Sequence, residues 1–387
     1  MENYLKLITE NPHRMMGVYA NSSVKAIMSN KSKALAFIKV GKDIAFPADL
    51  SCIMTPMPRS LAHVNDACGQ VLSENRLRYA QFWFMQMDAT DTEALNQLSL
   101  GELDVALRIW SEQETMSSLQ NRMICYFLQE DLPSAFSTAE TLYEKYGQAF
   151  IQQIDMPGLS QMSTSELSHL FLETLGAEVD LASLYDCCQS DEWKEIVTSI
   201  VVQSATSELS YEIEQYRNVN HTDPVTLKKA GENLMERSKK PLNNLQKVLS
   251  KESTQYQILA DKVGEEILNC CIEYVNLSQS EIYDSVHSIY KLLIYAKKTI
   301  VGMVAKRRFE QNYDMIKPLL SISKEDYKRA MRRPYMKKIR WGVILSIMIT
   351  VGIIVAFMEK EFSGFWMGLA MSVPLCVLTN RVMLLFE

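Results

Sequence analysis

Side chains that could carry out catalysis or hold a metal ion are scattered along this 387-residue sequence. The eight cysteines form no CxxC pair and no Cys/His set with the spacing of a zinc site. The sequence also lacks a glycine-rich phosphate loop, an HExxH metal motif and a GxSxG nucleophile motif. The histidines stand singly, at His13, His63, His169, His221 and His287. We therefore expect no catalytic residue, no metal site, no cofactor and no enzyme activity, and we interpret the cysteines as reduced and mostly buried.

Length and composition favour a globular protein of two or three units. Hydrophobic residues make up 47% of the chain and charged residues 22%, and the formal net charge is −6. An acidic chain of this kind is a poor partner for a polyanion, so we expect no nucleic-acid binding. The first residues, MENYLKLITENPHR, lack the basic region and apolar core of a signal peptide. The N-terminal part is therefore expected to stay in the cytosol.

Two apolar runs near the C-terminus predict membrane-spanning helices. Residues 341–358 contain eighteen uncharged residues, which would form about 27 Å of helix against a hydrocarbon core of about 30 Å. A second uncharged run covers residues 362–380, and Pro374 within it can be tolerated in a membrane helix. We predict two transmembrane helices in residues 341–387. The alternative is one span followed by a helix that lies at the membrane interface.

The charges around these runs predict the orientation of the chain in the membrane. Residues 328–340 contain seven basic residues and no acidic one, whereas the turn between the two runs is net negative. By the positive-inside rule, the bulk of the chain is cytoplasmic in an integral membrane protein. The basic segment is also expected to bind anionic lipid headgroups, at about 1 kcal/mol per basic residue. The predicted membrane-interface residues are Arg332, Arg333, Lys337, Lys338, Arg340, Trp341 and Trp366.

Residues 1–88 have the pattern of a small helical module. A helix capped by Ser22 or Ser23 is predicted to place five apolar residues on one face, namely Val24, Ile27, Met28, Leu35 and Ile38. A proline-rich loop follows, and a second helix is expected from about Arg59 to Leu72. A third helix is expected to begin near Glu74, after a break at Ser73, and to run through Met85.

Two stretches in this module resemble the J-domain, the DnaJ-type module that contacts DnaK-type chaperones. The segment NPHRMMGVYANSSVKAI is similar to the family's first helix and turn, with Met16-Gly17-Val18 at the turn. The segment VNDACGQVLSENRLRYAQF is similar to its third helix and the following break, with Val71-Leu72-Ser73 and Tyr79 in place. The resemblance covers residues 11–84. It implies partner binding through the basic face of the second helix, here Lys25, Lys31 and Lys33, although these lysines also fit an ordinary solvated helix face.

The loop of this module departs from the family pattern. The family depends on the tripeptide His-Pro-Asp to stimulate chaperone ATP hydrolysis. Here the loop reads Phe46-Pro47-Ala48-Asp49, and no histidine lies between His13 and His63. We therefore expect no stimulation of a DnaK-type ATPase. The aromatic run at residues 82–84 is expected to anchor the module to the helices that follow.

The remainder of the chain before the basic segment also predicts helices. Residues 89–155 contain two similar hairpins, with turns at residues 100–104 and 129–133, and Ala106 and Ala135 lie 29 residues apart. This pattern resembles tetratricopeptide repeats, which leaves both a peptide-binding groove and simple helix packing as interpretations. After a break at Pro157-Gly158, residues 156–327 are expected to form a helical bundle. The predicted fold is all-α, with no strand.

These predictions together indicate a membrane-anchored cytosolic adaptor or chaperone-related protein. Its partners would be other proteins, among them a DnaK-type chaperone as a candidate, and a bilayer with anionic headgroups. The alternative is a membrane-perturbing effector, whose C-terminal hairpin acts when the cytosolic part senses a partner. Asn380 and Arg381 near the second apolar run favour that alternative, because polar residues inside membranes are often functional.

Overall fold

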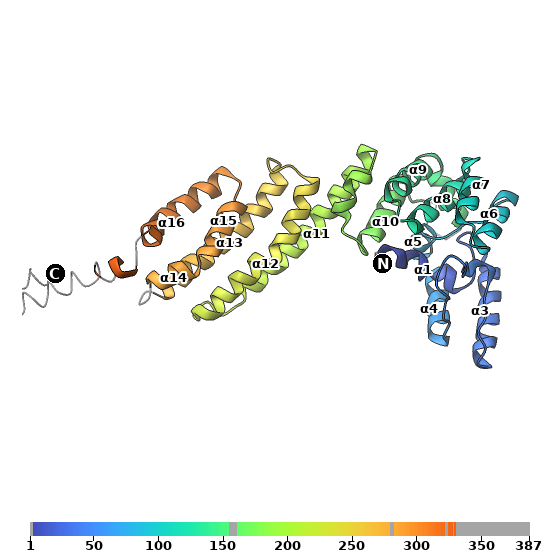
Figure 1. Ribbon diagram of the computed structural model, residues 1–387, viewed down its shortest axis with the longest axis horizontal. Coiled ribbons are helices and arrows are strands. Elements are labelled where there is room, and N and C mark those ends of the chain that lie inside the picture. Colours follow the sequence, from blue (N-terminus) through green and yellow to red (C-terminus); the bar gives the residue numbers. More distant parts are fainter. Residues whose placement is uncertain (1–2, 155–160, 279–281, 322–323, 328, 330–387) are drawn as a thin grey trace, which may run out of the picture. The chain divides into compact units, whose positions relative to one another are not determined.

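The computed structural model describes residues 3–154, 161–278, 282–321, 324–327 and 329. Within these ranges the chain is all-α, with helices joined by turns and no strand (Figure 1). This confirms the predicted fold class. The described residues form two compact units: the first consists of those within 3–218 and 233–263, and the second of those within 219–232 and 264–329.

The first 88 residues form short N-terminal helices followed by a pair of longer ones. Ser23 begins α3 by accepting a hydrogen bond from the Ala26 N–H, and Ser60 begins α4 by accepting one from the His63 N–H. The cap predicted at Ser22 or Ser23 is thus at Ser23, and the break predicted at Ser73 separates α4 from α5. The elements are η1 (Asn3–Leu5), α1 (Lys6–Thr9), α2 (Pro12–Met15), α3 (Val24–Lys39), η2 (Pro47–Asp49), α4 (Leu61–Val71) and α5 (Arg76–Ala80).

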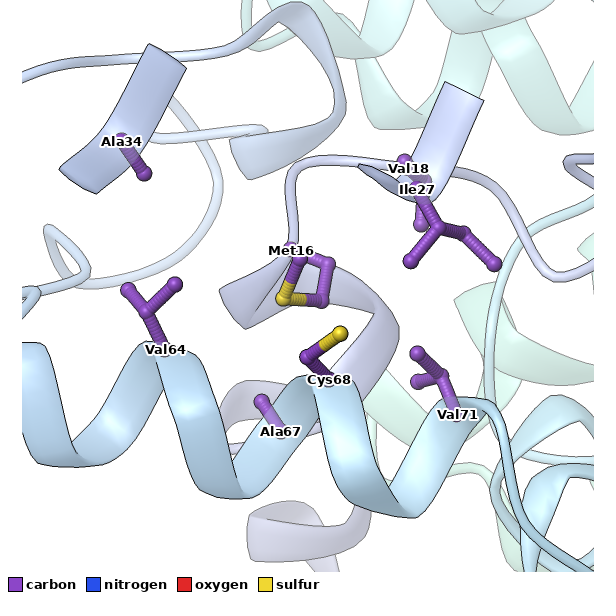
Figure 2. Close-up of a cluster of buried hydrophobic side chains, with 8 residues drawn as sticks. All are labelled: Met16, Val18, Ile27, Ala34, Val64, Ala67, Cys68 and Val71. Atoms are coloured by element: carbon purple, nitrogen blue, oxygen red, sulfur yellow. The ribbon is translucent and has the colours of Figure 1, made fainter. Parts of the chain in front are cut away.

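Helices α3 and α4 lie side by side and share a small core (Figures 1 and 2). Figure 2 shows the α4 side chains Val64, Ala67, Cys68 and Val71 facing Met16, Val18, Ile27 and Ala34. The buried face of α3 is centred on Ile27 and Ala34, and Leu35 and Ile38 flank it, half-buried.

Two residues expected on the apolar face of α3 are exposed, namely Val24 at 53% and Met28 at 44%. Met28 directly follows Ile27 and is therefore turned about 100° from it around the helix. The sequence pattern indicated a wider apolar stripe than the one that α4 covers.

Helices α6 to α11 complete most of the first unit. The two predicted hairpins are present, since α6 is followed by α7 and α8 by α9 across turns at the expected positions. Ala106 and Ala135 are fully buried, as expected for small residues where paired helices approach closely. The predicted break at Pro157-Gly158 lies outside the described residues. The elements are α6 (Ala89–Ser99), α7 (Leu103–Ser111), α8 (Met116–Leu128), α9 (Leu132–Ile154), α10 (Thr164–Gly176), η4 (Leu181–Cys187) and α11 (Asp191–Arg217).

The segment after α5 is not helical, and the predicted continuation of this helix through Met85 is wrong. Helix α5 ends at Ala80, and residues 84–87 have no regular structure. The side chain of Asn121 bonds both backbone groups of Met85, accepting from its N–H at 2.8 Å and donating to its carbonyl at 2.9 Å. The Phe84 carbonyl accepts from the Ala20 N–H at 2.9 Å. Tertiary partners therefore satisfy backbone groups that a helix would otherwise satisfy.

The aromatic run at residues 82–84 packs as predicted against neighbouring helices. Phe82 stacks on Phe171 of α10 with ring centroids 4.9 Å apart, and Phe84 stacks near Trp110 of α7. The indole N–H of Trp83 donates to the Val18 carbonyl at 2.9 Å. All three aromatic residues are at most 2% exposed. These three side chains therefore link the N-terminal helices to the hairpins through one shared hydrophobic core.

The rest of the described chain is mainly helical, and two of its helices are divided between the units at residues 232–233 and 263–264. Within residues 254–277, Val263, Ile267, Cys270 and Cys271 are buried at helical spacing, but Ile258 is 61% exposed. Val286, Ile289, Leu293 and Ala296 are also buried. The elements are α12 (Pro224–Val248), α13 (Thr254–Leu277), α14 (Ile282–Ser288), α15 (Tyr290–Thr299) and α16 (Met303–Ser321).

None of the helices in the described ranges is both long enough and apolar enough to cross a bilayer. The two spans predicted in residues 341–387 lie outside the described residues. The same holds for the predicted interface residues Arg332, Arg333, Lys337, Lys338, Arg340, Trp341 and Trp366.

Candidate functional site

A buried ion pair fixes the loop between α3 and α4. The Asp49 carboxylate accepts hydrogen bonds from two nitrogens of the Arg59 guanidinium, at 2.5 and 2.9 Å, and a third from the Phe46 N–H at 2.9 Å. The side chains of Arg59 and Asp49 are only 3% and 4% exposed. The carboxylate in this loop is therefore committed to contacts within the protein.

Arg59 also ties the loop to the N-terminal helices. Its guanidinium donates to the carbonyls of Met15, Ile44 and Arg14 at 2.9 to 3.0 Å. The same group lies over the Phe46 ring, 4.9 Å from its centroid, which adds a cation–π contact. The Arg59 side chain thus combines an ion pair with hydrogen bonds to the backbone of the loop and of the N-terminal helices.

Arg14 forms the second tie between the N-terminal segment and the loop. It is 1% exposed and donates to the carbonyls of Asp49 at 2.9 Å, Thr9 at 2.6 Å and Thr55 at 2.6 Å. Burial lowers the pKa of the Arg14 guanidinium, and the nearby Asp49 charge opposes that effect. Three carbonyl acceptors satisfy most of its donors, as a buried guanidinium requires.

A groove of about 730 Å³ lies beside this fixed loop. One wall comes from the N-terminal segment, the second from the loop and the third from α4. The lining residues are Leu5, Lys6, Thr9, Glu10, Pro12, Arg14, Met15, residues 53–58, His63, Asp66, Ala67, Gln70 and Leu128. The volume lies within the range of about 300 to 1,000 Å³ that is typical of ligand pockets.

The groove combines an adaptable apolar wall with a charged rim. Three methionines, Met15, Met54 and Met57, line it together with three prolines. Methionine side chains are flexible and can adapt to ligands of irregular shape. At the rim, Lys6, Glu10, His63 and Asp66 are exposed, so both signs of charge are available. The groove therefore offers an apolar surface and charges of both signs.

The three lysines predicted to bind a partner lie on α3. Lys25 and Lys33 are exposed, and Lys31 is half-buried. Lys25 is close to the middle of the solvent-facing side, whereas Lys31 lies near the edge that packs on α4. They therefore do not form a single compact patch, and Lys25 with Lys33 is the more accessible pair.

The histidines do not converge on a reaction centre. His13 is fully buried, and its Nε2 has no hydrogen-bond partner within the described structure. Burial, with Arg76 nearby, lowers the pKa of His13 to about 3, which keeps the ring neutral. In the second unit the Nδ1 of His221 lies 2.6 Å from a carboxylate oxygen of Glu273. Because the two residues are 52 positions apart in sequence, no local pattern predicts this pairing.

The described cysteines are mostly buried, as predicted. Cys68, Cys125, Cys188, Cys270 and Cys271 are buried, and the described thiols are free. Burial raises the pKa of the Cys125 thiol and raises that of Cys188 to about 12, so both thiols remain protonated. The described part of the chain contains no group of three His, Cys, Asp or Glu side chains that could hold a metal ion.

Sequence reasoning missed the two arginines and the groove. Arg14 lies in the run Pro12-His13-Arg14-Met15-Met16, where apolar neighbours surround a single charge. A charge in such a run is a signal for a buried, hydrogen-bonded side chain. No comparable sequence signal predicts the groove, because its lining residues lie more than 100 positions apart in sequence at the extremes, Leu5 and Leu128.

Comparisons with known proteins assign the chain to no family: no family model, no curated protein sequence and no solved structure matches it.

Proposed function

We propose that the chain is a non-catalytic adaptor that binds another protein on the cytosolic side of a membrane. Its first 88 residues would be a J-like module with an altered loop. Support comes from the order of elements, with α3 and α4 side by side and a break at Ser73 before α5. The hairpins α6–α7 and α8–α9 would be its TPR-like body.

The groove beside the loop is the observation that carries this proposal. Its methionine and proline walls can bury apolar side chains of a partner segment. Glu10 and Asp66 at the rim would attract a basic side chain of the same segment. Lys25 and Lys33 on α3 would provide a separate contact for an acidic surface.

A photo-crosslinking experiment tests the groove. A photoreactive residue in place of Met57, inside the groove, should crosslink one protein in native membranes. The same residue in place of Met87, which is 46% exposed and lies elsewhere, should not. Equal labelling from both positions would refute a specific binding groove. The lysine contact is tested by the double change Lys25→Glu with Lys33→Glu, which should reduce the amount of partner protein that is captured. The single change Lys229→Glu on α12 should leave that amount unchanged.

The altered loop supports a role without chaperone stimulation. Histidine is missing from the loop, and the Asp49 carboxylate is held by Arg59 and the Phe46 N–H. The full chain in detergent should leave the ATP turnover of a DnaK-type chaperone unchanged. A J-domain protein with an intact His-Pro-Asp loop serves as the positive control. Stimulation by the chain comparable to that control would refute this part of the proposal.

The membrane anchor in residues 341–387 remains a proposal from the sequence, as does a cytoplasmic bulk of the chain. The alternative role as a membrane-perturbing effector depends on the same residues. Expression of residues 328–387 alone separates the two roles. Loss of membrane potential would favour the effector, whereas an intact potential would favour a passive anchor.

A further inference from the structure

The turn between α15 and α16 combines exposed cations with exposed apolar side chains. Met303 and Val304, which begin α16, are 87% and 76% exposed. Exposed basic residues flank them in the sequence, namely Lys297 and Lys298 at the end of α15 and Lys306 and Arg307 in the first two turns of α16. We define these six residues as the basic turn. Residues 291–310 contain six basic residues and one acidic residue, Glu310.

Most cations of the basic turn have no partner within the described structure. Arg308 next to the turn is engaged with Glu265 of α13 at 2.8 Å, and Lys297 lies over the Tyr313 ring at 5.4 Å. In contrast, Lys298, Lys306 and Arg307 form no ion pair with a described carboxylate. Their charges are therefore available to an anionic surface.

Buried side chains fix the backbone of the turn. Ile300, the C-cap residue of α15, is only 2% exposed and packs against Gly264 of α13 so closely that a Cβ at Gly264 would overlap its side chain. Thr299 is also buried, at 7% exposure. Because buried side chains fix the turn, the exposed side chains of Met303 and Val304 start from a backbone of defined position. Arg307 follows Met303 by one helical turn and shares its face.

We propose that the basic turn lies against anionic lipid headgroups, with Met303 and Val304 at the boundary between headgroups and acyl chains. This inference rests on the proposed membrane anchor, which would bring the second unit near a bilayer. A bilayer fits both properties of the patch, since anionic headgroups attract the cations and the interface accepts small apolar side chains. A nucleic acid would match the cations through its phosphates, but its phosphate backbone would not bury the two exposed apolar side chains.

Hydrogen exchange of the full chain in lipid vesicles tests the proposal. The first amide groups of a helix lack intrahelical acceptors, so those of Met303 and Val304 should exchange quickly when they face water. In vesicles with phosphatidylserine they should exchange at least about fivefold more slowly than in pure phosphatidylcholine. This factor follows from a gain of about fivefold in affinity for each basic residue near an anionic surface. Lys306→Glu with Arg307→Glu should remove this difference. Lys317→Glu, a matched exposed lysine later in α16, should leave it intact.

The outcomes separate this inference from the membrane anchor. Flotation of the chain with phosphatidylcholine vesicles reports the anchor alone. A chain that floats without the lipid-dependent protection, or keeps it in the double variant, overturns the inference and leaves the anchor standing. If the chain does not float with phosphatidylcholine, the anchor fails, and binding to phosphatidylserine vesicles that the double variant loses supports the inference by itself. Protection by a short RNA duplex but not by lipid would assign the patch to nucleic acid and overturn it.

Discussion

The buried pair of Arg59 and Asp49 gives the sharpest test of the loop structure. The change is Asp49→Asn in the full chain, which removes the negative charge and keeps the shape of the side chain. Loss of one partner from a buried ion pair costs about 3 to 5 kcal/mol. Arg59 keeps three carbonyl acceptors, on Arg14, Met15 and Ile44, so the lower end of that range applies here. A cost of about 3 kcal/mol corresponds to a rise of roughly 100-fold in the population of the opened loop and its neighbouring helices.

Hydrogen exchange of the amides in α3 and α4 measures that population. We expect exchange to accelerate by about two orders of magnitude in Asp49→Asn. Asp43→Asn is the matched control, since Asp43 lies in the same loop but is exposed. Adding Arg59→Met to Asp49→Asn should recover part of the loss, because no uncompensated charge stays buried. An effect of Asp49→Asn below about 1 kcal/mol, or strict additivity of the two changes, would refute a structural role for the pair.

Three further changes have defined outcomes. Gly17→Ala should destabilise the first unit well beyond Gly41→Ala, since both glycines have φ of +66° but only at Gly17 would a Cβ overlap the Phe46 ring; equal melting temperatures for the two variants would contradict this. His13 has a folded-state pKa of about 3, below its unfolded value of 6.5, so its contribution is present above pH 6.5 and is lost as the pH falls below it. Between pH 7.5 and 5.5 this loss should be roughly 1 to 2 kcal/mol and should be absent from the pH profile of His13→Gln in urea unfolding. Deletion of residues 328–387 should release the remaining chain into the soluble fraction, and its retention in the membrane pellet would contradict the proposed anchor.

The sequence was sufficient to predict features that depend on neighbouring residues. A cap at Ser22 or Ser23, the break at Ser73 and the two hairpin turns all follow from local patterns; the structure has the cap at Ser23 and each of the other features. Small buried residues such as Ala106 were also predictable, because their position after a tight turn is itself a local signal.

Features that depend on distant partners were not predictable in the same way. The helix expected through Met85 ends at Ala80, because Asn121 and Ala20 supply the hydrogen bonds of the segment that follows. Ile258 has a helical spacing that favours burial, but no described neighbour covers it, and it is 61% exposed. The groove likewise depends on the approach of α4 to the N-terminal segment, which no single stretch of sequence reveals.

The arginine contacts of the loop also bear on the thermodynamics of partner binding. A loop that becomes ordered only in a complex subtracts its lost conformational entropy from the affinity. Here Arg14 and Arg59 already hold residues 44–55 in one conformation before any partner arrives. A ligand in the adjacent groove would therefore meet a rigid receptor wall, and its association should show a small entropic penalty from the protein side.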